Sequence, residues 1–415
     1  MKLSEELTWR GFVNQTTYKD ITVLDGQPIT FYWGVDPSAD SMTIGNFAIA
    51  MMIRHFIAAG HKAVLLVGGA TGLIGDPDGK SQERDLQSLD TIAYNKQAIA
   101  AQYTTIFDGL SFDNVDNYDW FKNFNYLDFL RDIGKHVPMR TMLGRDFVSS
   151  RLGEDGAGIS YAEFSYSLIQ GYDFLHLHRE RGVSLQVCGA DQWGNSIAGV
   201  DLIRRVTGDE AHVWSAPLVI NKTTGVKFGK SEDGAVWLDP AKTSPTKFYQ
   251  FWINCDDAGV ADYLKIYTLL TQSEIEAILV EQQAHPSARL AQKRLAYEVT
   301  KLVHGAIAAQ LAATLTDFLT GAQAVNTADV DSLAALKQEV AYCQARAGAS
   351  VIDCLVQTGL AASTSEARRL VSGNAISVNG QKITGDTLTA DHFLDGYLIL
   401  RRGKAFKDSA LVELA

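Results

Sequence analysis

The sequence predicts an α/β fold, in which a parallel sheet with flanking helices is followed by a helical segment and a small α+β tail. The sheet is predicted by three β-rich apolar stretches, at residues 29–35, 63–67 and 184–187. Each stretch runs into a glycine-bearing turn and then into residues with the apolar spacing of a helix. Repeated strand, turn and helix are typical of a parallel sheet, whose ligand crevice lies at the carboxyl ends of its strands.

The turns after these strands carry most of the polar residues that could act in chemistry. The first strand leads into DPSADSMTIGN and then into the helix-like AIAMMIRHFIAAG. The second leads into GGATGLIGDPDGK, and the third into CGADQWGNSIAGVDLIRR, where the apolar spacing becomes helical again. The candidate functional residues of this part therefore sit at strand ends or just after them.

The rest of the chain changes character twice. From about Thr243 to Leu336 the apolar spacing is mostly helical. Near Gly348 it gives way to SEARRLVSGNAISVNGQKI, which reads as a short helix, a glycine-bearing turn and a small β element, followed by YLILRRGKAF. No internal repeat or low-complexity segment is visible in the sequence.

Composition indicates a globular protein of the reducing cytosol. Of the 415 residues, 46 % are apolar and 20 % are charged, and no apolar run approaches the ~20 residues needed to span a bilayer. The N-terminus, MKLSEELTWR, does not resemble a signal peptide. The four cysteines form no CxxC pair and have no histidine at ligand spacing, a pattern that argues against a zinc site and favours free thiols. We therefore expect a cytoplasmic protein with no membrane partner and no protein-bound metal site.

The net charge of −11 argues against a general attraction to nucleic acid. Its distribution is uneven, because residues 347–415 carry seven basic and seven acidic side chains. The first 346 residues therefore hold the whole excess of acidic groups. Any contact with RNA would have to use local basic patches.

Two short segments resemble the signatures of class I aminoacyl-tRNA synthetases. DPSADSMTIGN resembles the first signature, usually HIGH, and KFGKS at 227–231 resembles the second, usually KMSKS. Adenylate formation builds negative charge on the leaving pyrophosphate, so positioned donors and cations lower its barrier. A glycine lets the backbone approach the nucleotide, the N-terminus of the following helix suits phosphate, and a lysine loop can close over it.

Further segments resemble one member family, the bacterial-type tyrosyl-tRNA synthetases, in that family's order. They are FYWGVDP, GGATGLIGDP, NYDWF with FLRDIGKH, EFSYSLIQGYDFLHL and GADQWGN, and the similarity continues through KTSPTKFYQFWIN and VTKLVHG into the tail. The resemblance implies a Rossmann-like catalytic domain over 1–232 that includes a connective insertion and the dimer interface. It also implies a helical anticodon-binding domain over 233–345 and an S4-like RNA-binding domain over 346–415. A homodimer that uses tyrosine, ATP and tRNA(Tyr), with Mg²⁺ assisting the phosphates, is the expected assembly.

The resemblance also implies roles for residues of the amino-acid pocket. Tyr32 and Asp173 match the pair that binds the phenol hydroxyl of tyrosine, and such a buried pair is left unsatisfied by phenylalanine. Asp76, Tyr166 and Gln170 match the group around the substrate ammonium, and Gln192 matches a position near the carboxylate. On a helix, Tyr166, Gln170 and Asp173 would share one face because their spacing is i, i+4, i+7.

Further matches concern the nucleotide and RNA. Positions near the adenylate are matched by Gly34, Asp36, Gly45, Gly189 and Asp191, and the signature residues are Thr43, Asn46, Lys227 and Lys230. Lys80 and Arg84 match residues that reach pyrophosphate, although both could equally be solvated loop charges. In the tail, Arg368, Arg369 and Lys382, with Asn379 and Gly380, lie at the S4 motif and could grip RNA by a small basic face. A folded appendage without RNA is the alternative.

Three positions depart from the family. Thr43 and Asn46 stand where the first signature has its two histidines, and Trp33 stands where a small residue is common near the ribose. Asn46 still offers an amide donor, whereas the hydroxyl of Thr43 is short and uncharged. Besides an active tyrosine–tRNA ligase, the sequence leaves open an enzyme for a tyrosine analogue and a catalytically weakened paralogue that binds RNA or regulates. Trp33 must either reshape the pocket or point away from it.

Overall fold

The computed structural model describes residues 1–77, 86–144, 146–153, 158–231, 234–383, 385–403 and 405–415. The chain forms two compact units, one of residues 1–242 with 255–291 and the other of residues 243–254 with 292–415. The expected division into three domains stays a prediction. Among the described residues, no helix combines the length and the apolar character needed to cross a bilayer.

The first unit is built on a six-stranded sheet, which confirms the predicted α/β fold. The strand order is β1-β6-β5-β2-β3-β4, and all neighbours are parallel except the edge pair β1 and β6. The strands are β1 (Gln15–Thr16), β2 (Thr30–Val35), β3 (Lys62–Val67), β4 (Phe112–Asp116), β5 (Leu185–Gly189) and β6 (His212–Ala216). The three apolar stretches of the sequence correspond to β2, β3 and β5, which lie side by side in the centre.

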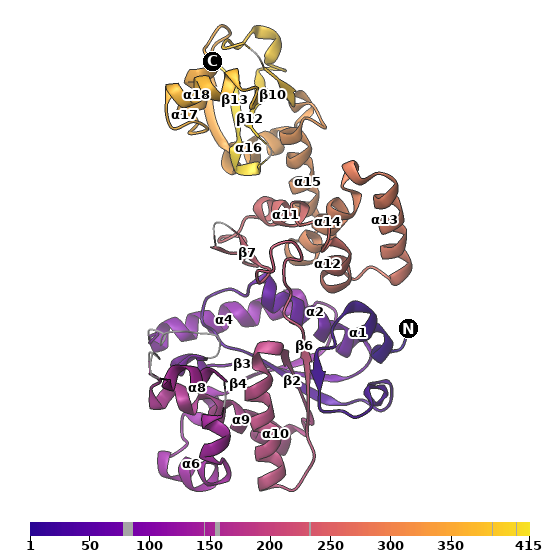
Figure 1. Cartoon of the computed structure of the whole chain (residues 1–415), viewed down its shortest axis with the longest axis vertical. Coiled ribbons are helices and arrows are strands. Elements are labelled where there is room, and N and C mark those ends of the chain that lie inside the picture. The colour runs from indigo at the N-terminus through magenta and orange to yellow at the C-terminus, as the bar shows by residue number, and fades with distance from the viewer. Residues whose placement is uncertain (78–85, 145, 154–157, 232–233, 384, 404) are drawn as a thin grey trace. The chain divides into compact units, whose positions relative to one another are not determined.

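Helices cover both faces of this sheet (Figure 1). They are α1 (Leu3–Arg10), α2 (Ile44–Ala58), α3 (Thr71–Ile74), α4 (Leu89–Ile106), α5 (Tyr118–Phe121), α6 (Tyr126–Asp132), α7 (Met139–Leu143), α8 (Asp146–Leu152), α9 (Tyr161–Arg181) and α10 (Trp193–Val206). Two further helices of this unit, α12 (Val260–Tyr267) and α13 (Gln272–Ala284), come later in the chain. Two short antiparallel strands, β7 (Lys230–Ser231) and β8 (Gly234–Ala235), include the last two residues of the lysine-rich signature.

Successive side chains of β2 lie on opposite faces of the sheet. Tyr32 faces α9, where its ring centroid lies 5.2 Å from that of Phe174. Trp33 faces the other way and packs against Tyr103 of α4 at 5.6 Å. Successive residues of a strand point to opposite faces. Figure 1 accordingly shows α2 and α4 along one side of the sheet and α9 and α10 along the other.

The second unit joins helices to a small mixed sheet. Its helices are α11 (Pro245–Ile253), α14 (Leu290–His304), α15 (Ala306–Thr320), α16 (Val330–Glu339), α17 (Val351–Gln357) and α18 (Thr364–Ser372). The sheet order is β11-β10-β12-β13-β9, with β9 (Ala341–Ala345), β10 (Ile376–Val378), β11 (Gln381–Lys382), β12 (Tyr397–Arg402) and β13 (Ser409–Leu414). Leu398 and Leu400 of β12 pack with residues of α17 and α18, whereas Ile399 packs with residues of α15 and α16. Helices therefore cover both faces of the tail's sheet.

Candidate active site

A cavity of about 660 Å³ opens at the carboxyl ends of β2 and β5 in the first unit. It brings together residues that are far apart in the sequence. The expected site residues that line it are Tyr32, Gly34, Asp36, Thr43, Gly45, Asn46, Asp76, Tyr166, Gln170, Asp173, Gly189, Asp191, Gln192 and Lys227. Their place in the fold is the one that a parallel α/β sheet gives to a ligand crevice.

Tyr32 and Asp173 form the deep polar part of the cavity. Tyr32 is 1 % exposed and Asp173 is 2 % exposed. Burial raises the pKa of Tyr32 well above its ordinary value, so its hydroxyl stays protonated and can donate. Among the described residues, this hydroxyl has no hydrogen-bond partner. A buried and unsatisfied donor of this kind favours a ligand that brings its own polar group.

Two residues that sequence reasoning did not single out hold the Asp173 carboxylate in place. Asn117 donates from Nδ2 to Asp173 Oδ2 at 3.0 Å, and Trp120 donates from Nε1 to Asp173 Oδ1 at 2.9 Å. Burial nevertheless raises the pKa of Asp173 to about 8, against the lowering effect of these two hydrogen bonds. Both partners belong to the NYDWF motif. The motif therefore pointed to this segment, but it did not reveal that these two residues bind Asp173.

A second group of polar side chains lies around Asp36 and Asp76. Tyr166 donates its hydroxyl to Asp36 Oδ2 at 2.6 Å, and Thr71 donates to Asp36 Oδ1 at 2.6 Å. Gln192 donates from Nε2 to Asp76 Oδ2. Carboxylates fixed in this way present negative charge to the cavity, which suits an ammonium group.

The helix α9 places three of the expected residues on one face, as their spacing predicts. Tyr166, Gln170 and Asp173 all line the cavity. Within the described part of the chain, Gln170 Oε1 has no hydrogen-bond partner, and neither has Oε1 of Gln186, which is 3 % exposed and also lines the cavity. Sequence reasoning missed Gln186. Only the structure indicates a role for Gln186, because the pairing of β2 with β5 places it opposite Tyr32.

The other end of the cavity is formed by the start of α2. Thr43 Oγ1 donates to Asn46 Oδ1 at 3.0 Å, and the main-chain N–H of Thr43 reaches the same oxygen at 3.1 Å. Gly45 follows in the first turn, where a Cβ would lie 3.5 Å from Thr43 Oγ1. The first turn of α2 therefore lines the cavity, although Ile44 N–H already donates to Val236 O at 3.1 Å and Phe47 N–H to Thr43 O at 3.0 Å. A helix N-terminus in this place suits a phosphate.

The lysine-rich segment lies beside the same end. Lys227 Nζ is 3.4 Å from Asp191 Oδ2, and both side chains are about half exposed. Phe228 anchors the segment, because it is 7 % exposed and stacks on Tyr263 of α12 at 4.2 Å. Gly229 has a φ of +103°, and a Cβ there would lie 2.8 Å from Ile44 Cγ1. Only glycine combines that backbone conformation with so close an approach.

Three expected residues cannot be placed fully. The backbone of Lys230 lies in β7, but its side chain is outside the described part of the chain. Lys80 and Arg84 lie outside the described residues altogether. Their roles stay predictions.

The structure shows the direction of the Trp33 ring, whereas its effect on the ribose pocket stays a prediction. This residue borders the cavity, but it is 4 % exposed and its indole packs against Tyr103 on the face of the sheet opposite to Tyr32. The bulky ring therefore points away from the phenol end of the pocket.

The expected RNA-binding residues belong to the second unit. Arg368 and Arg369 are exposed on α18, and Lys382 is exposed on β11. Asn379 has a structural task in the turn between β10 and β11, since its side chain donates to His392 O at 2.8 Å and accepts from Ile399 N at 2.9 Å. The three basic residues form no part of the cavity.

Within the described residues, no group of three or more His, Cys, Asp or Glu side chains is arranged to hold a metal ion. The acidic residues of the cavity are instead engaged by neighbouring hydroxyl, amide and ammonium groups.

Comparison with known proteins agrees with this geometry. Residues 24–320 match the family model described as tRNA synthetases class I (W and Y), and residues 332–407 match the model of the tyrosine–tRNA ligase SYY-like C-terminal domain. The chain is 42 % identical to a tyrosine–tRNA ligase 2 of Bacillus cereus over 430 aligned positions, which cover 100 % of both chains. It is 43 % identical to the tyrosine–tRNA ligase of Limosilactobacillus fermentum over 97 % of this chain and 98 % of the relative. Among solved structures, a C-terminally truncated mitochondrial tyrosyl-tRNA synthetase of Aspergillus nidulans matches with a TM-score of 0.68 and 29 % identity, covering 75 % of this chain and 92 % of that one.

Proposed function

This chain belongs to the class I tyrosyl-tRNA synthetases, and we propose that it activates L-tyrosine with ATP and transfers the tyrosyl group to the 3′ end of tRNA(Tyr). The polar groups at the deep end of the cavity support tyrosine as the amino-acid substrate. There the buried Tyr32 hydroxyl stands in the same pocket as Asp173, whose carboxyl group is held by Asn117 and Trp120. A phenol can donate to one of these groups and accept from the other, whereas a phenyl ring leaves both unsatisfied.

The first step joins the two small substrates. A carboxylate oxygen of tyrosine attacks the α-phosphorus of ATP, the bond to the β-phosphate oxygen breaks, and pyrophosphate leaves with the electron pair. Asp76, Tyr166 and Gln170 would hold the ammonium group, and Gln192 would lie near the carboxylate. No side chain needs to become a covalent nucleophile, because positioning and charge stabilisation supply the catalysis.

The nucleotide would lie against the start of α2 and the ends of β2 and β5. Gly34, Asp36 and Gly45 would contact its ribose and phosphates together with Gly189 and Asp191. Donors for the developing charge would come from Asn46 and from the lysines at 227 and 230, with Lys80 and Arg84 reaching the pyrophosphate. Mg²⁺ would enter with the ATP phosphates.

In the second step, a ribose hydroxyl at the 3′ end of the tRNA attacks the activated carbonyl carbon, and AMP leaves. The tail would hold the RNA through its exposed basic residues Arg368, Arg369 and Lys382. Their charges would attract phosphate groups locally, which matters in a chain with a net charge of −11.

A homodimer is part of the proposal. Exposed apolar side chains gather on α6 to α9, where a second copy of the chain could cover them. They are Tyr126, Leu127, Leu130, Met139, Leu143, Leu152 and Tyr161, with exposed fractions between 36 % and 70 %. Tyr126 and Tyr161 lie within hydrogen-bond reach, at 3.4 Å between hydroxyl oxygens, so the two ends of this set adjoin. Apolar groups concentrated in this way are typical of interfaces between subunits.

The proposal is tested by tyrosine-dependent exchange of pyrophosphate into ATP, with phenylalanine as the control substrate and Lys230→Ala as the control variant. Exchange that requires tyrosine and falls in the variant supports the ligase. A folded protein that binds tyrosine without exchange would instead be the weakened paralogue. That alternative is not favoured, because curated relatives that align over the full length are tyrosine–tRNA ligases.

A further inference from the structure

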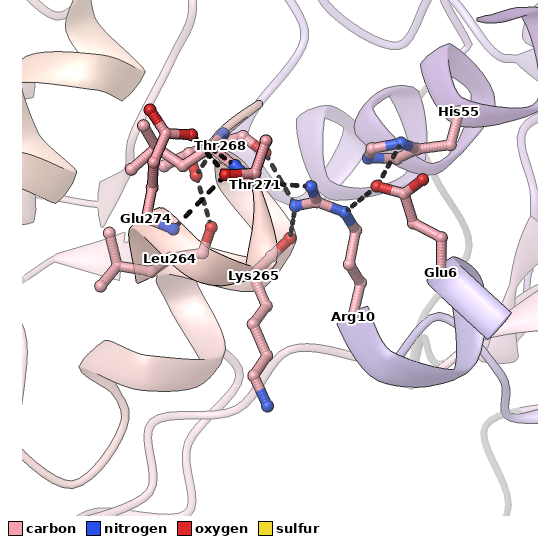
Figure 2. Close-up of polar contacts among 9 residues, drawn as sticks. Glu6, Arg10, His55, Leu264, Lys265, Thr268, Thr271 and Glu274 are labelled. Atoms are coloured by element: carbon pink, nitrogen blue, oxygen red, sulfur yellow. Dashed lines mark hydrogen bonds and ion pairs between the residues drawn. The ribbon is translucent and has the colours of Figure 1, made fainter. Parts of the chain in front are cut away.

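Arg10, at the end of the N-terminal helix α1, makes an unusual set of hydrogen bonds. Its Nη1 donates to Lys265 O at 2.7 Å and to Thr268 O at 3.0 Å, and its Nη2 donates to Leu270 O at 2.8 Å. Its Nε donates to Glu6 Oε1 at 3.0 Å. Arg10 is 3 % exposed, so one buried guanidinium binds three main-chain carbonyls that lie some 255 to 260 residues further along the chain (Figure 2).

These carbonyls belong to the C-terminal end of α12 and the residues that follow it. The last carbonyls of a helix have no partner within the helix and lie at the negative end of its dipole. A guanidinium is well suited to them, because its planar fork of donors binds several acceptors at once without losing its charge. Arg10 therefore fixes both the position and the ending of α12.

The helix α12 carries two buried aromatic residues toward the nucleotide end of the cavity. Tyr263 stacks on Phe228, the residue that follows Lys227, with ring centroids 4.2 Å apart. Tyr267 stacks on Phe47, the residue that follows Asn46, at 6.1 Å. Both tyrosines are at most 1 % exposed, and their spacing of four residues places them on one face of the helix. One face of α12 therefore packs against Phe228 of the lysine-rich signature and against Phe47, directly after the first signature.

Arg10 is also connected to α2 itself. Its partner Glu6 lies with Oε1 3.5 Å from His55 Nδ1, in the last turns of α2 (Figure 2). Burial and then the charge of Arg10 lower the pKa of His55 to about 4, so the ring is neutral at neutral pH and this contact is not an ion pair. The charge of Glu6 is therefore directed at Arg10 and helps to hold the guanidinium.

We propose that Arg10 is a positioning residue for the ATP half of the active site. By fixing the end of α12, it sets where Tyr263 and Tyr267 hold the lysine-rich segment and the start of α2. The tyrosine half of the cavity is built from β2, β5 and α9, which Arg10 does not contact through these bonds. The inference rests on the proposed function and adds to it a residue outside both signatures.

The experiment compares the full-length wild-type protein with Arg10→Met, which keeps an unbranched stem but removes the guanidinium and its donors. Steady-state pyrophosphate exchange gives KM for ATP and kcat, and equilibrium dialysis without ATP gives Kd for tyrosine. We expect kcat/KM for ATP to fall by about 10- to 100-fold, because displacement of a positioning element acts on the transition state at a distance. Kd for tyrosine should stay unchanged. Arg10→Lys should recover part of the loss, since an ammonium can bind some of the carbonyls but not all three.

Ser4→Ala is the matched control. Ser4 also anchors α1, because its main-chain N–H donates to Asp25 Oδ1 at 2.9 Å and its Oγ donates to Asp25 Oδ2 at 2.6 Å. The substitution removes the second of these bonds and none of the contacts to α12. The control should leave kcat/KM for ATP near the wild-type value. An equal loss in Ser4→Ala, or an equal weakening of tyrosine binding in Arg10→Met, would show a general effect on folding and overturn the inference.

If Arg10→Met does not fold, Tyr263→Leu tests the same proposal at the contact between α12 and the lysine-rich segment. It keeps an apolar side chain but removes the stack on Phe228 and the hydrogen bonds of the hydroxyl to Ile220 O and Asp256 Oδ1. It should therefore also lower kcat/KM for ATP while sparing the Kd for tyrosine. Unchanged ATP kinetics in either folded variant overturn the inference alone. A wild-type protein without exchange overturns the proposed function as well.

Discussion

Thr43 and Asn46 hold each other across the first turn of α2, with both the hydroxyl and the main-chain N–H of Thr43 directed at Asn46 Oδ1. A main-chain N–H can only donate, so the atom that faces it must be the oxygen of the carboxamide. The Nδ2 group of Asn46 is thereby turned to the other side, and Asn46 lines the cavity. In this chain, Asn46 is the candidate donor to the nucleotide, and Thr43 orients it.

The relationship predicts a graded loss of activity. Asn46→Ala should lower kcat for pyrophosphate exchange by about 100-fold, as removal of a donor to developing charge commonly does. Thr43→Val removes only one of the two bonds that orient Asn46, so its loss should be no more than about 10-fold. Thr43→Ser keeps both bonds and should resemble the wild type. If Thr43→Val were as damaging as Asn46→Ala, Thr43 would itself contact the nucleotide.

Tyr32→Phe should weaken the choice between tyrosine and phenylalanine. Loss of the buried hydroxyl removes one hydrogen bond to the phenol, which should raise Kd for tyrosine by about 10-fold. The ratio of kcat/KM for the two amino acids in pyrophosphate exchange measures the choice directly. Tyr103→Phe is the control, because Tyr103 is also fully buried but lies against Trp33 on the opposite face of the sheet. A fall of the ratio in the control would remove Tyr32 from its proposed role.

Asp173 should make stability depend on pH. In the folded chain its carboxyl keeps the proton up to about pH 8, whereas an ordinary carboxyl loses it near 3.8. The folded state therefore binds this proton more tightly between these values, and its contribution to stability is lost as the pH rises from about 4 to about 8. The side chain introduced by Asp173→Asn cannot titrate. The free energy of unfolding of the variant should therefore rise relative to that of the wild type as the pH increases.

Urea unfolding of the two proteins at pH 5.5 and pH 8 measures this difference. The substitution also changes the bonds with Asn117 and Trp120, which affects both pH values, so only the change between them is informative. Equal differences at the two pH values would mean that Asp173 is ionised throughout.

The apolar set on α6 to α9 should control the oligomeric state. Leu127 is 70 % exposed, and Leu127→Lys would place a charge in the proposed interface between two copies. We expect the variant to be monomeric at concentrations where the wild type is dimeric, as measured by sedimentation equilibrium. Val280→Lys on α13 is the control, because Val280 is 67 % exposed but lies outside this set. A variant that remains dimeric would place the interface elsewhere.

Much of the first unit could be predicted because its signals are local. An apolar run followed by a glycine-bearing turn predicted β2, β3 and β5, since a strand buried on both faces needs apolar side chains throughout. The same logic placed the polar residues at strand ends, and the cavity indeed lies there. Helical spacing alone predicted that Tyr166, Gln170 and Asp173 share one face of α9.

Other features depend on packing between distant segments, and only the tertiary structure decided them. No spacing in the sequence joins Asn117 and Trp120 to Asp173, Gln186 to Tyr32, or Arg10 to the end of α12. The sequence likewise posed the question of Trp33, and the direction of its ring followed from the pairing of β2 in the sheet. Residues 255–291 also belong with the first unit although residues 243–254 belong with the second. The local elements could be predicted from the sequence because propensity and periodicity act over a few residues. The tertiary structure decided which groups meet, because a hydrogen bond requires two groups at about 3 Å, and that distance is set by the packing of the whole unit.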